Sequence, residues 1–175
     1  AIYTVEANAG TGGTITPAGM STVTHGTNLS YAITPATGYR ISDVRVDNSS
    51  VGPVSAYAFN NVTSNHSITA YFAPITFDIT AGSGTGGSIS PSGITSVTYG
   101  SSQAFTIVPS QGYSISDVMV DNVSRGPVNS YTFSNVTSNH TINASFAANR
   151  YTIYASAGQG GTVAPSGTTT VSYGS

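Results

Sequence analysis

The side chains of this sequence with the clearest chemical potential are two pairs of aspartates. Asp43 and Asp47 recur later in the chain as Asp117 and Asp121. Carboxylates are preferred ligands of Ca²⁺, but the ion takes about six to eight oxygen donors. No further oxygen donors cluster beside either pair, so we interpret these aspartates as solvent-facing residues next to turns and predict no metal site.

Zinc binding and catalysis have equally little support in the sequence. There are three histidines, His25, His66 and His140, and no cysteine, which leaves no closely spaced set of zinc ligands. Serine is so common that a Ser/His/acid set carries no information, and no Gly-X-Ser-X-Gly pattern occurs. The glycine-rich run 10–13 lacks the lysine of a phosphate-binding loop. We therefore predict a protein that is not an enzyme and has no cofactor.

N-glycosylation is the one covalent modification that the sequence offers. Asparagine stands in the Asn-X-Ser/Thr pattern at several positions, three of which recur at a fixed spacing. The candidate glycosylation residues are Asn48, Asn61, Asn65, Asn122, Asn135 and Asn139. The alternative, which we favour, is that these asparagines are turn and outer-strand residues.

The elements that hold these side chains repeat along the chain. Gly13 recurs as Gly87 and Gly161, and 87 − 13 and 161 − 87 both give 74. Solenoid repeats are shorter, roughly 20 to 50 residues. A period of this length predicts small domains, each with its own core.

The repeat boundaries follow from this period. We place the first copy at 1–74, the second at 75–148 and the start of a third, incomplete copy at 149–175. An equally valid phase counts whole units at 28–101 and 102–175. The sequence does not choose between the two.

Each copy reads as a series of short strands. No stretch shows the helical spacing of apolar residues, whereas Tyr3, Val5 and Ala7 alternate with polar neighbours as in a half-buried strand. Turn signals include Asp47 and Asn48, followed by a loop through Gly52 and Pro53. Six or seven strands per copy predict an all-β fold. The modules are then small antiparallel β-sandwiches or open barrels, possible relatives of the β-grasp fold without its helix.

The predicted core is aromatic and aliphatic. On one face of the strands we expect Tyr31 and Ile33, with Val44 and Val46 on the next strand. The main aromatic core residues are predicted to be Tyr39, Tyr57, Phe59 and Phe72, with their equivalents in the second copy.

Composition excludes two classes of partner. The chain carries a net charge of −2, its four basic residues are all arginine, and it contains no basic cluster. Nucleic acids and anionic membranes therefore offer it no electrostatic attraction. No apolar run reaches the roughly 18 to 20 residues that span a bilayer, so we predict no membrane insertion and expect any targeting segment to lie outside this stretch or to have been removed.

The repeated pattern resembles a known family. It runs through Gly38-Tyr39, Val44-X-Val46-Asp47, Tyr57-X-Phe59-X-Asn61-Val62-Thr63 and Asn65-His66-X-Ile68-X-Ala70-X-Phe72. This is similar to the divergent internalin-type B-repeat family, which occurs in tandem on bacterial extracellular and cell-surface proteins. The likeness covers the whole chain, and it implies a stalk, adhesive or matrix segment without catalysis.

The sequence is consistent with three functions. The leading hypothesis is a structural repeat segment of a secreted or cell-surface prokaryotic protein, acting as a stalk, adhesin spacer or extracellular fibre whose partners are the neighbouring repeats. The second is a glycan-binding module that uses an exposed tyrosine such as Tyr71 or Tyr154 for surface glycans. The third is a filament subunit that pairs with other copies of itself through edge strands of low charge.

Overall fold

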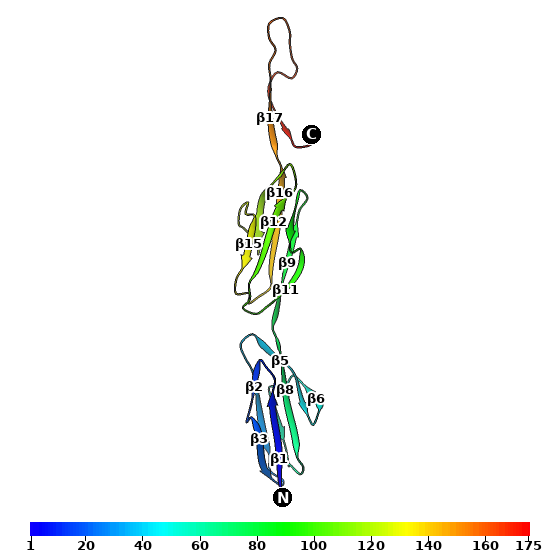
Figure 1. The fold of residues 1–175 in the computed structure, drawn as a ribbon, viewed down its shortest axis with the longest axis vertical. Helices are drawn as coiled ribbons and strands as arrows, with labels where there is room; N and C mark the ends of the chain where they lie inside the picture. Colours follow the sequence, from blue (N-terminus) through cyan, green and yellow to red (C-terminus); the bar gives the residue numbers. More distant parts are fainter. The chain divides into compact units, whose positions relative to one another are not determined.

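All secondary structure in this protein is β-strand. The computed structural model describes residues 1–175 and contains 18 strands, β1 to β18, and no helix (Figure 1). The chain divides into two compact units, Ala1–Thr76 and Phe77–Ser175. The predicted all-β class with tandem modules is confirmed, whereas the predicted boundaries at 74/75 and 148/149 stay predictions. No helix of a length and hydropathy suited to crossing a membrane occurs.

The first copy contains eight strands. They are β1 (Ile2–Ala9), β2 (Gly13–Thr16), β3 (Gly19–Thr24), β4 (Leu29–Pro35), β5 (Tyr39–Val46), β6 (Ser49–Gly52), β7 (Ala56–Phe59) and β8 (His66–Pro74). A five-stranded sheet has the order β3-β1-β8-β5-β6, and a three-stranded sheet has the order β2-β4-β7. All pairs are antiparallel except β1 with β8, which run parallel from Val5↔His66 to Ala9↔Ala70.

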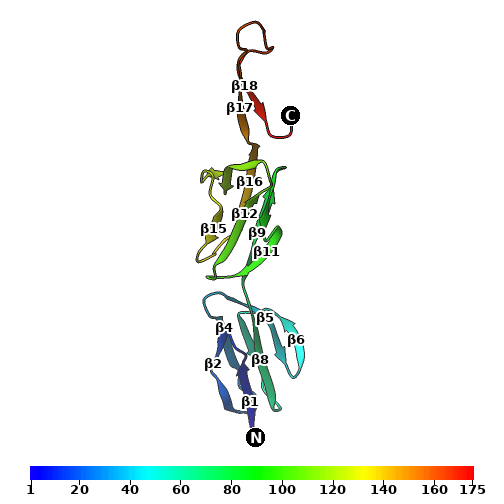
Figure 2. The same ribbon diagram turned by 45° about the horizontal axis from the view of Figure 1, so that its top comes forward.

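The second copy repeats this topology. Its strands are β9 (Thr76–Ser83), β10 (Gly87–Ser90), β11 (Gly93–Thr98), β12 (Gln103–Pro109), β13 (Tyr113–Val120), β14 (Val123–Ser124), β15 (Ser130–Phe133) and β16 (His140–Ala148). They form sheets of order β11-β9-β16-β13-β14 and β10-β12-β15. Figure 2 shows β12 and β15 of the smaller sheet beside β9 and β16 of the larger one.

The start of the third copy forms a two-stranded hairpin of β17 (Arg150–Ala155) and β18 (Gly167–Ser172). These strands correspond to β1 and β3, and the pairing Tyr151↔Val171 matches Tyr3↔Val23.

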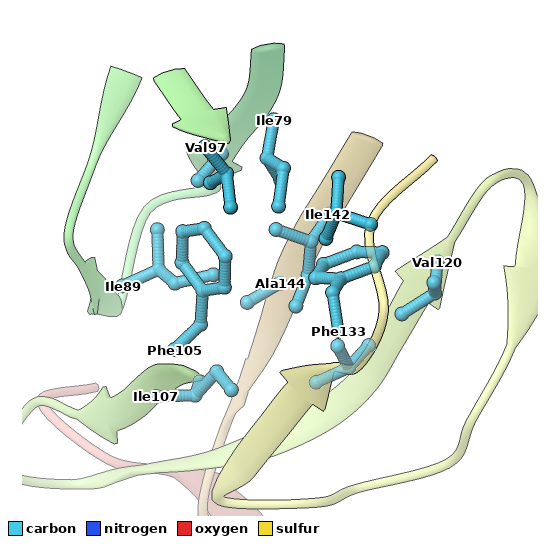
Figure 3. Packing of buried hydrophobic residues seen from close by; sticks show 12 residues of the cluster. Ile79, Ile89, Val97, Phe105, Ile107, Val120, Phe133, Ile142 and Ala144 are labelled. Atoms are coloured by element: carbon cyan, nitrogen blue, oxygen red, sulfur yellow. The ribbon is translucent and has the colours of Figure 1, made fainter. Parts of the chain in front are cut away.

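Each complete copy is a β-sandwich because both of its sheets contribute to one core. In the first copy Val5 and Ile68 of the larger sheet pack with Tyr31 and Phe59 of the smaller sheet. The second copy has an equivalent cluster, in which Phe105 takes the place of Tyr31 (Figure 3). In the first copy the rings of Tyr31 and Phe59 meet edge to face, with their centroids 6.0 Å apart and their planes at 83°. Nonpolar side chains from two facing sheets thus provide the packing that holds each module together.

Strand β6 corrects the predicted loop through Gly52. Asp47 and Asn48 have positive φ values of 49° and 66°, as in the two-residue turns that match the twist of a hairpin. The turn folds Ser49 back onto Val46 and the chain continues as β6 up to Gly52, so the predicted loop begins only at Pro53. The predicted turn at Asp47 and Asn48 is confirmed.

The predicted aromatic core is confirmed only in part. Phe59 is buried at 6% exposure, whereas Tyr57 and Phe72 are half-buried and pack at the margin of the core. Tyr39 is also half-buried, but its ring lies over Gly12 and is not part of the core cluster. The ring of Phe72 lies directly against the backbone of Gly13, where a Cβ would overlap it. The recurring glycine therefore makes room for a ring that seals the sandwich from the side.

Candidate functional sites

A histidine and an aspartate form a hydrogen-bonded pair in each complete copy. His66 Nδ1 donates to Asp47 Oδ2 at 2.7 Å, and Ser67 N–H donates to Asp47 Oδ1 at 2.8 Å. The second copy repeats the pair, with His140 Nδ1 at 2.7 Å from Asp121 Oδ2. Both carboxylate oxygens thus tie the β5–β6 turn to the first residues of β8.

The histidine of the pair also packs against the edge of the core. The ring of His66 lies over Phe59, with ring centroids 4.9 Å apart and planes tilted by 32°. Partial burial acts to raise the pKa of Asp47, but the hydrogen bonds from His66 and Ser67 outweigh it, so the pKa lies below the ordinary value of 3.8. The aspartate is therefore held in its charged form.

A serine extends each pair into a Ser-His-Asp line that the sequence did not single out. Ser64 Oγ lies 3.3 Å from His66 Nε2, and Ser138 Oγ lies 3.5 Å from His140 Nε2. A nucleophile and its base stand closer, at roughly 2.6 to 3.2 Å. The contacts that are short here join histidine to aspartate and aspartate to backbone, which is the geometry of a structural tie.

The aspartates considered for calcium bind different partners. Asp43 accepts hydrogen bonds from Arg45 Nε at 3.1 Å and from Ser50 Oγ at 2.6 Å, while Asp47 is bound to His66. No group of three or more His, Cys, Asp or Glu side chains is arranged to hold a metal ion.

An open groove of about 360 Å³ lies on the outer face of β5 and β8 in the first copy. Its lining residues are Ser42, Asp43, Arg45 and Tyr71. The guanidinium of Arg45 stands over the ring of Tyr71, 5.7 Å from its centroid. Tyr71 and Tyr154, the two tyrosines considered for glycan contact, are 43% and 73% exposed, and only Tyr71 lines this groove.

A second open groove, of about 460 Å³, lies in the second copy. Several of its lining side chains already have hydrogen-bond partners: His140 donates to Asp121, which also lines the groove, and Asp78 accepts from Ser96 Oγ, which lies outside the lining. The amide oxygen of Asn139 accepts the backbone N–H of Asp78 at 2.9 Å. This groove is therefore bordered by internal structural bonds.

The glycosylation candidates are all exposed and fall in three classes. Asn48 and Asn122 occupy the hairpin turns, and Asn61 and Asn135 have positive φ in the turns before β8 and β16. The third class, Asn65 and Asn139, accepts a backbone hydrogen bond through the side-chain oxygen. Glycosylation of these residues stays a prediction.

Within the second unit, the hairpin of the third copy is bound to the second copy. Asn149 N–H donates to Gly112 O, and Tyr173 N–H donates to Asn149 O, both at 2.8 Å. The ring of Tyr173 covers Gly112 so closely that a Cβ there would overlap it. In the first unit Ile75 N–H makes the equivalent bond to Gly38 O, also at 2.8 Å. The connection after a copy is thus anchored to the body of that copy.

Comparison with protein families gave one result, and it covers both complete copies. The model described as the divergent InlB B-repeat domain matches residues 3–76 and again residues 77–150. Comparison with curated proteins and with solved structures gave no match. Repeats of this family are generally structural and typically non-enzymatic, and they are associated with extracellular or surface proteins of bacteria.

Proposed function

Because the chain belongs to the divergent InlB B-repeat family, we propose that it is a non-enzymatic spacer within a secreted or surface-anchored prokaryotic protein. Its copies act as a stalk that sets a distance, and the partner of each copy is the neighbouring repeat.

The observation that carries this proposal is the anchored connection at Gly112. This connection has its own hydrogen bonds and a packed tyrosine, so it resists bending better than a flexible linker, whose end-to-end distance fluctuates freely. The self-contained core of each complete copy supports the same role, because copies with separate cores can be added without redesign.

The test is the length of the molecule as a function of copy number. A nine-residue strand such as β8 spans about 30 Å at about 3.3 Å per residue, so each added copy is expected to lengthen the particle by about 20 to 30 Å. Small-angle scattering of chains with increasing numbers of copies measures this increment. Chains that gain mass without gaining length contradict the proposal.

A matched pair of variants tests the connection itself. Tyr173→Ala is expected to loosen the hairpin from the second copy, whereas Tyr154→Ala, at a side chain 73% exposed, leaves it bound. The measurement is NMR relaxation of the β17 and β18 amides relative to those of the second copy. Equal mobility in the two variants contradicts the role of Tyr173.

A second candidate, filament formation through edge strands, is favoured by β3 and β11. These strands are edges of their sheets, carry no charged residue and expose Met20 and Ile94 at 71% and 69%. Electron microscopy of the purified chain separates the two functions, because fibres indicate strand pairing between chains and single particles indicate a spacer.

A further inference from the structure

We propose that the outer face of β5 and β8 in the first copy is a binding site for a neutral glycan of pyranose sugars. This activity goes beyond the spacer role and does not depend on it. The site is the groove of about 360 Å³ lined by Ser42, Asp43, Arg45 and Tyr71, and its volume falls in the lower part of the roughly 300 to 1,000 Å³ of small-ligand sites.

Tyr71 supplies the apolar surface of the site. It is 43% exposed on β8, directly opposite Asp43 of β5. The guanidinium of Arg45, 5.7 Å from the ring centroid, holds the ring by a cation–π contact. A tyrosine ring offers a large rigid surface with a polar tip, which suits the C–H face and the hydroxyl rim of a pyranose.

Asp43 and Arg45 supply fixed hydrogen-bonding groups beside that ring. Arg45 uses Nε to bind Asp43 at 3.1 Å, which leaves its terminal N–H groups as donors in a planar fork. Hydrogen bonds from Ser50 and then from Arg45 lower the pKa of Asp43, so its carboxylate is a charged acceptor at neutral pH. A donor fork next to a carboxylate matches two neighbouring sugar hydroxyls, each of which donates and accepts.

A β-bulge shapes the floor of the groove. Ile41 pairs with Phe72 and Asp43 pairs with Tyr71, so Ser42 is the unpaired extra residue of β5. Bulges change the direction of neighbouring side chains and are frequent next to binding sites. Here the bulge adds the exposed Ser42 to the lining of the groove.

The charge of the groove selects a neutral ligand. The carboxylate of Asp43 and the guanidinium of Arg45 carry opposite charges and are the only charged side chains that line it. A uronic or sialic acid therefore finds no uncompensated positive charge, while the hydroxyls of a neutral sugar find both a donor and an acceptor.

The second copy provides an internal control, because it has the same backbone without the site. Met119 and Ser145 stand at the positions of Arg45 and Tyr71. Asp117 keeps its serine partner, Ser124, but also accepts the backbone N–H of Gly126 at 3.0 Å.

The experiment is an NMR titration of the full chain with cellohexaose, maltohexaose and N,N′-acetylated chitohexaose, and with a galacturonic acid hexamer as the anionic probe. We expect at least one neutral probe to change the NMR chemical shifts of the protein, and we expect these changes to be confined to β5, β8 and the Arg45 Nε–H. Shift changes with none of the neutral probes, or with the anionic probe alone, overturn the proposal.

Variants that exchange residues between the copies make the test specific. Tyr71→Ser and Arg45→Met install the residues that the second copy already accommodates, and each is expected to weaken binding about tenfold or more. The reciprocal double variant Met119→Arg with Ser145→Tyr is expected to raise the number of bound glycans per chain from one to two. Unchanged affinity in the thermally stable Tyr71→Ser chain overturns the site.

Discussion

The two complete copies agree inside and differ outside. Every buried position of the first copy has a buried counterpart 74 residues later, from Val5 and Ile79 to Ala70 and Ala144, and the second copy buries one further residue, Val97. On the outer face of β5 and β8, by contrast, Arg45 and Tyr71 of the first copy are replaced in the second copy. The fold therefore constrains the core strictly, whereas the outer face accepts substitutions that change its chemistry.

The hairpin of the third copy shows what the core requires. Ile153 is 53% exposed, whereas Val5 and Ile79 at the same position are fully buried. Strand β17 has the same alternation as β1, and its antiparallel partner β18 corresponds to β3, the partner of β1. Burial therefore comes from the parallel strand and the second sheet of a complete copy, and not from strand pairing alone.

The largest expected effect comes from removing a central ring of one core. Phe105 is fully buried, so Phe105→Ala is expected to cost about 3 to 5 kcal/mol of the free energy of unfolding of the second copy. Because the two clusters are separate, the first copy is expected to keep its stability. Urea denaturation followed by NMR signals of each copy measures both values. Ile94→Ala, at a residue 69% exposed, is the control, and joint unfolding of both copies in the Phe105→Ala chain contradicts independent cores.

A smaller effect of opposite sign is expected at the equivalent position of the first copy. The hydroxyl of Tyr31 is buried without a hydrogen-bond partner, and the second copy has phenylalanine there. Tyr31→Phe is therefore expected to stabilise the first copy by about 1 to 2 kcal/mol, because an unsatisfied buried polar group costs about that much. Phe105→Tyr is the reciprocal variant and is expected to destabilise the second copy. A loss of stability in the Tyr31→Phe chain contradicts this prediction, because it means that the hydroxyl has a hydrogen-bond partner in the folded protein.

Local patterns in the sequence were sufficient for much of this fold. Alternation placed Val44 and Val46 in the core and Arg45 outside, and the Asx residues at 47 and 48 marked a turn. Both signals act within a few residues, where strand geometry and turn chemistry alone decide the structure.

Features that depend on pairing between distant strands were not predictable in this way. Asp47 and His66 are 19 residues apart, and only the pairing of β5 with β8 brings them together. The parallel pairing of β1 with β8 and the groove between Arg45 and Tyr71 have the same origin. The sequence analysis did not use the one available signal, which is the recurrence of an Asp and a His 19 residues apart in both copies.

The smallest expected effect concerns acid, and it compares the two Asp-His pairs. The folded-state pKa of Asp47 lies below 3.8, so the carboxylate contributes stability above that pH and loses it as the pH falls toward the folded-state pKa. Asp47→Asn is expected to cost the first copy about 1 kcal/mol at about pH 7, because the group is largely exposed, and less at about pH 3. Asp121→Asn is the matched variant and shifts the same response to the second copy. The measurement is urea denaturation of each copy at both pH values, and an equal cost at the two pH values rules out the charged carboxylate as the source.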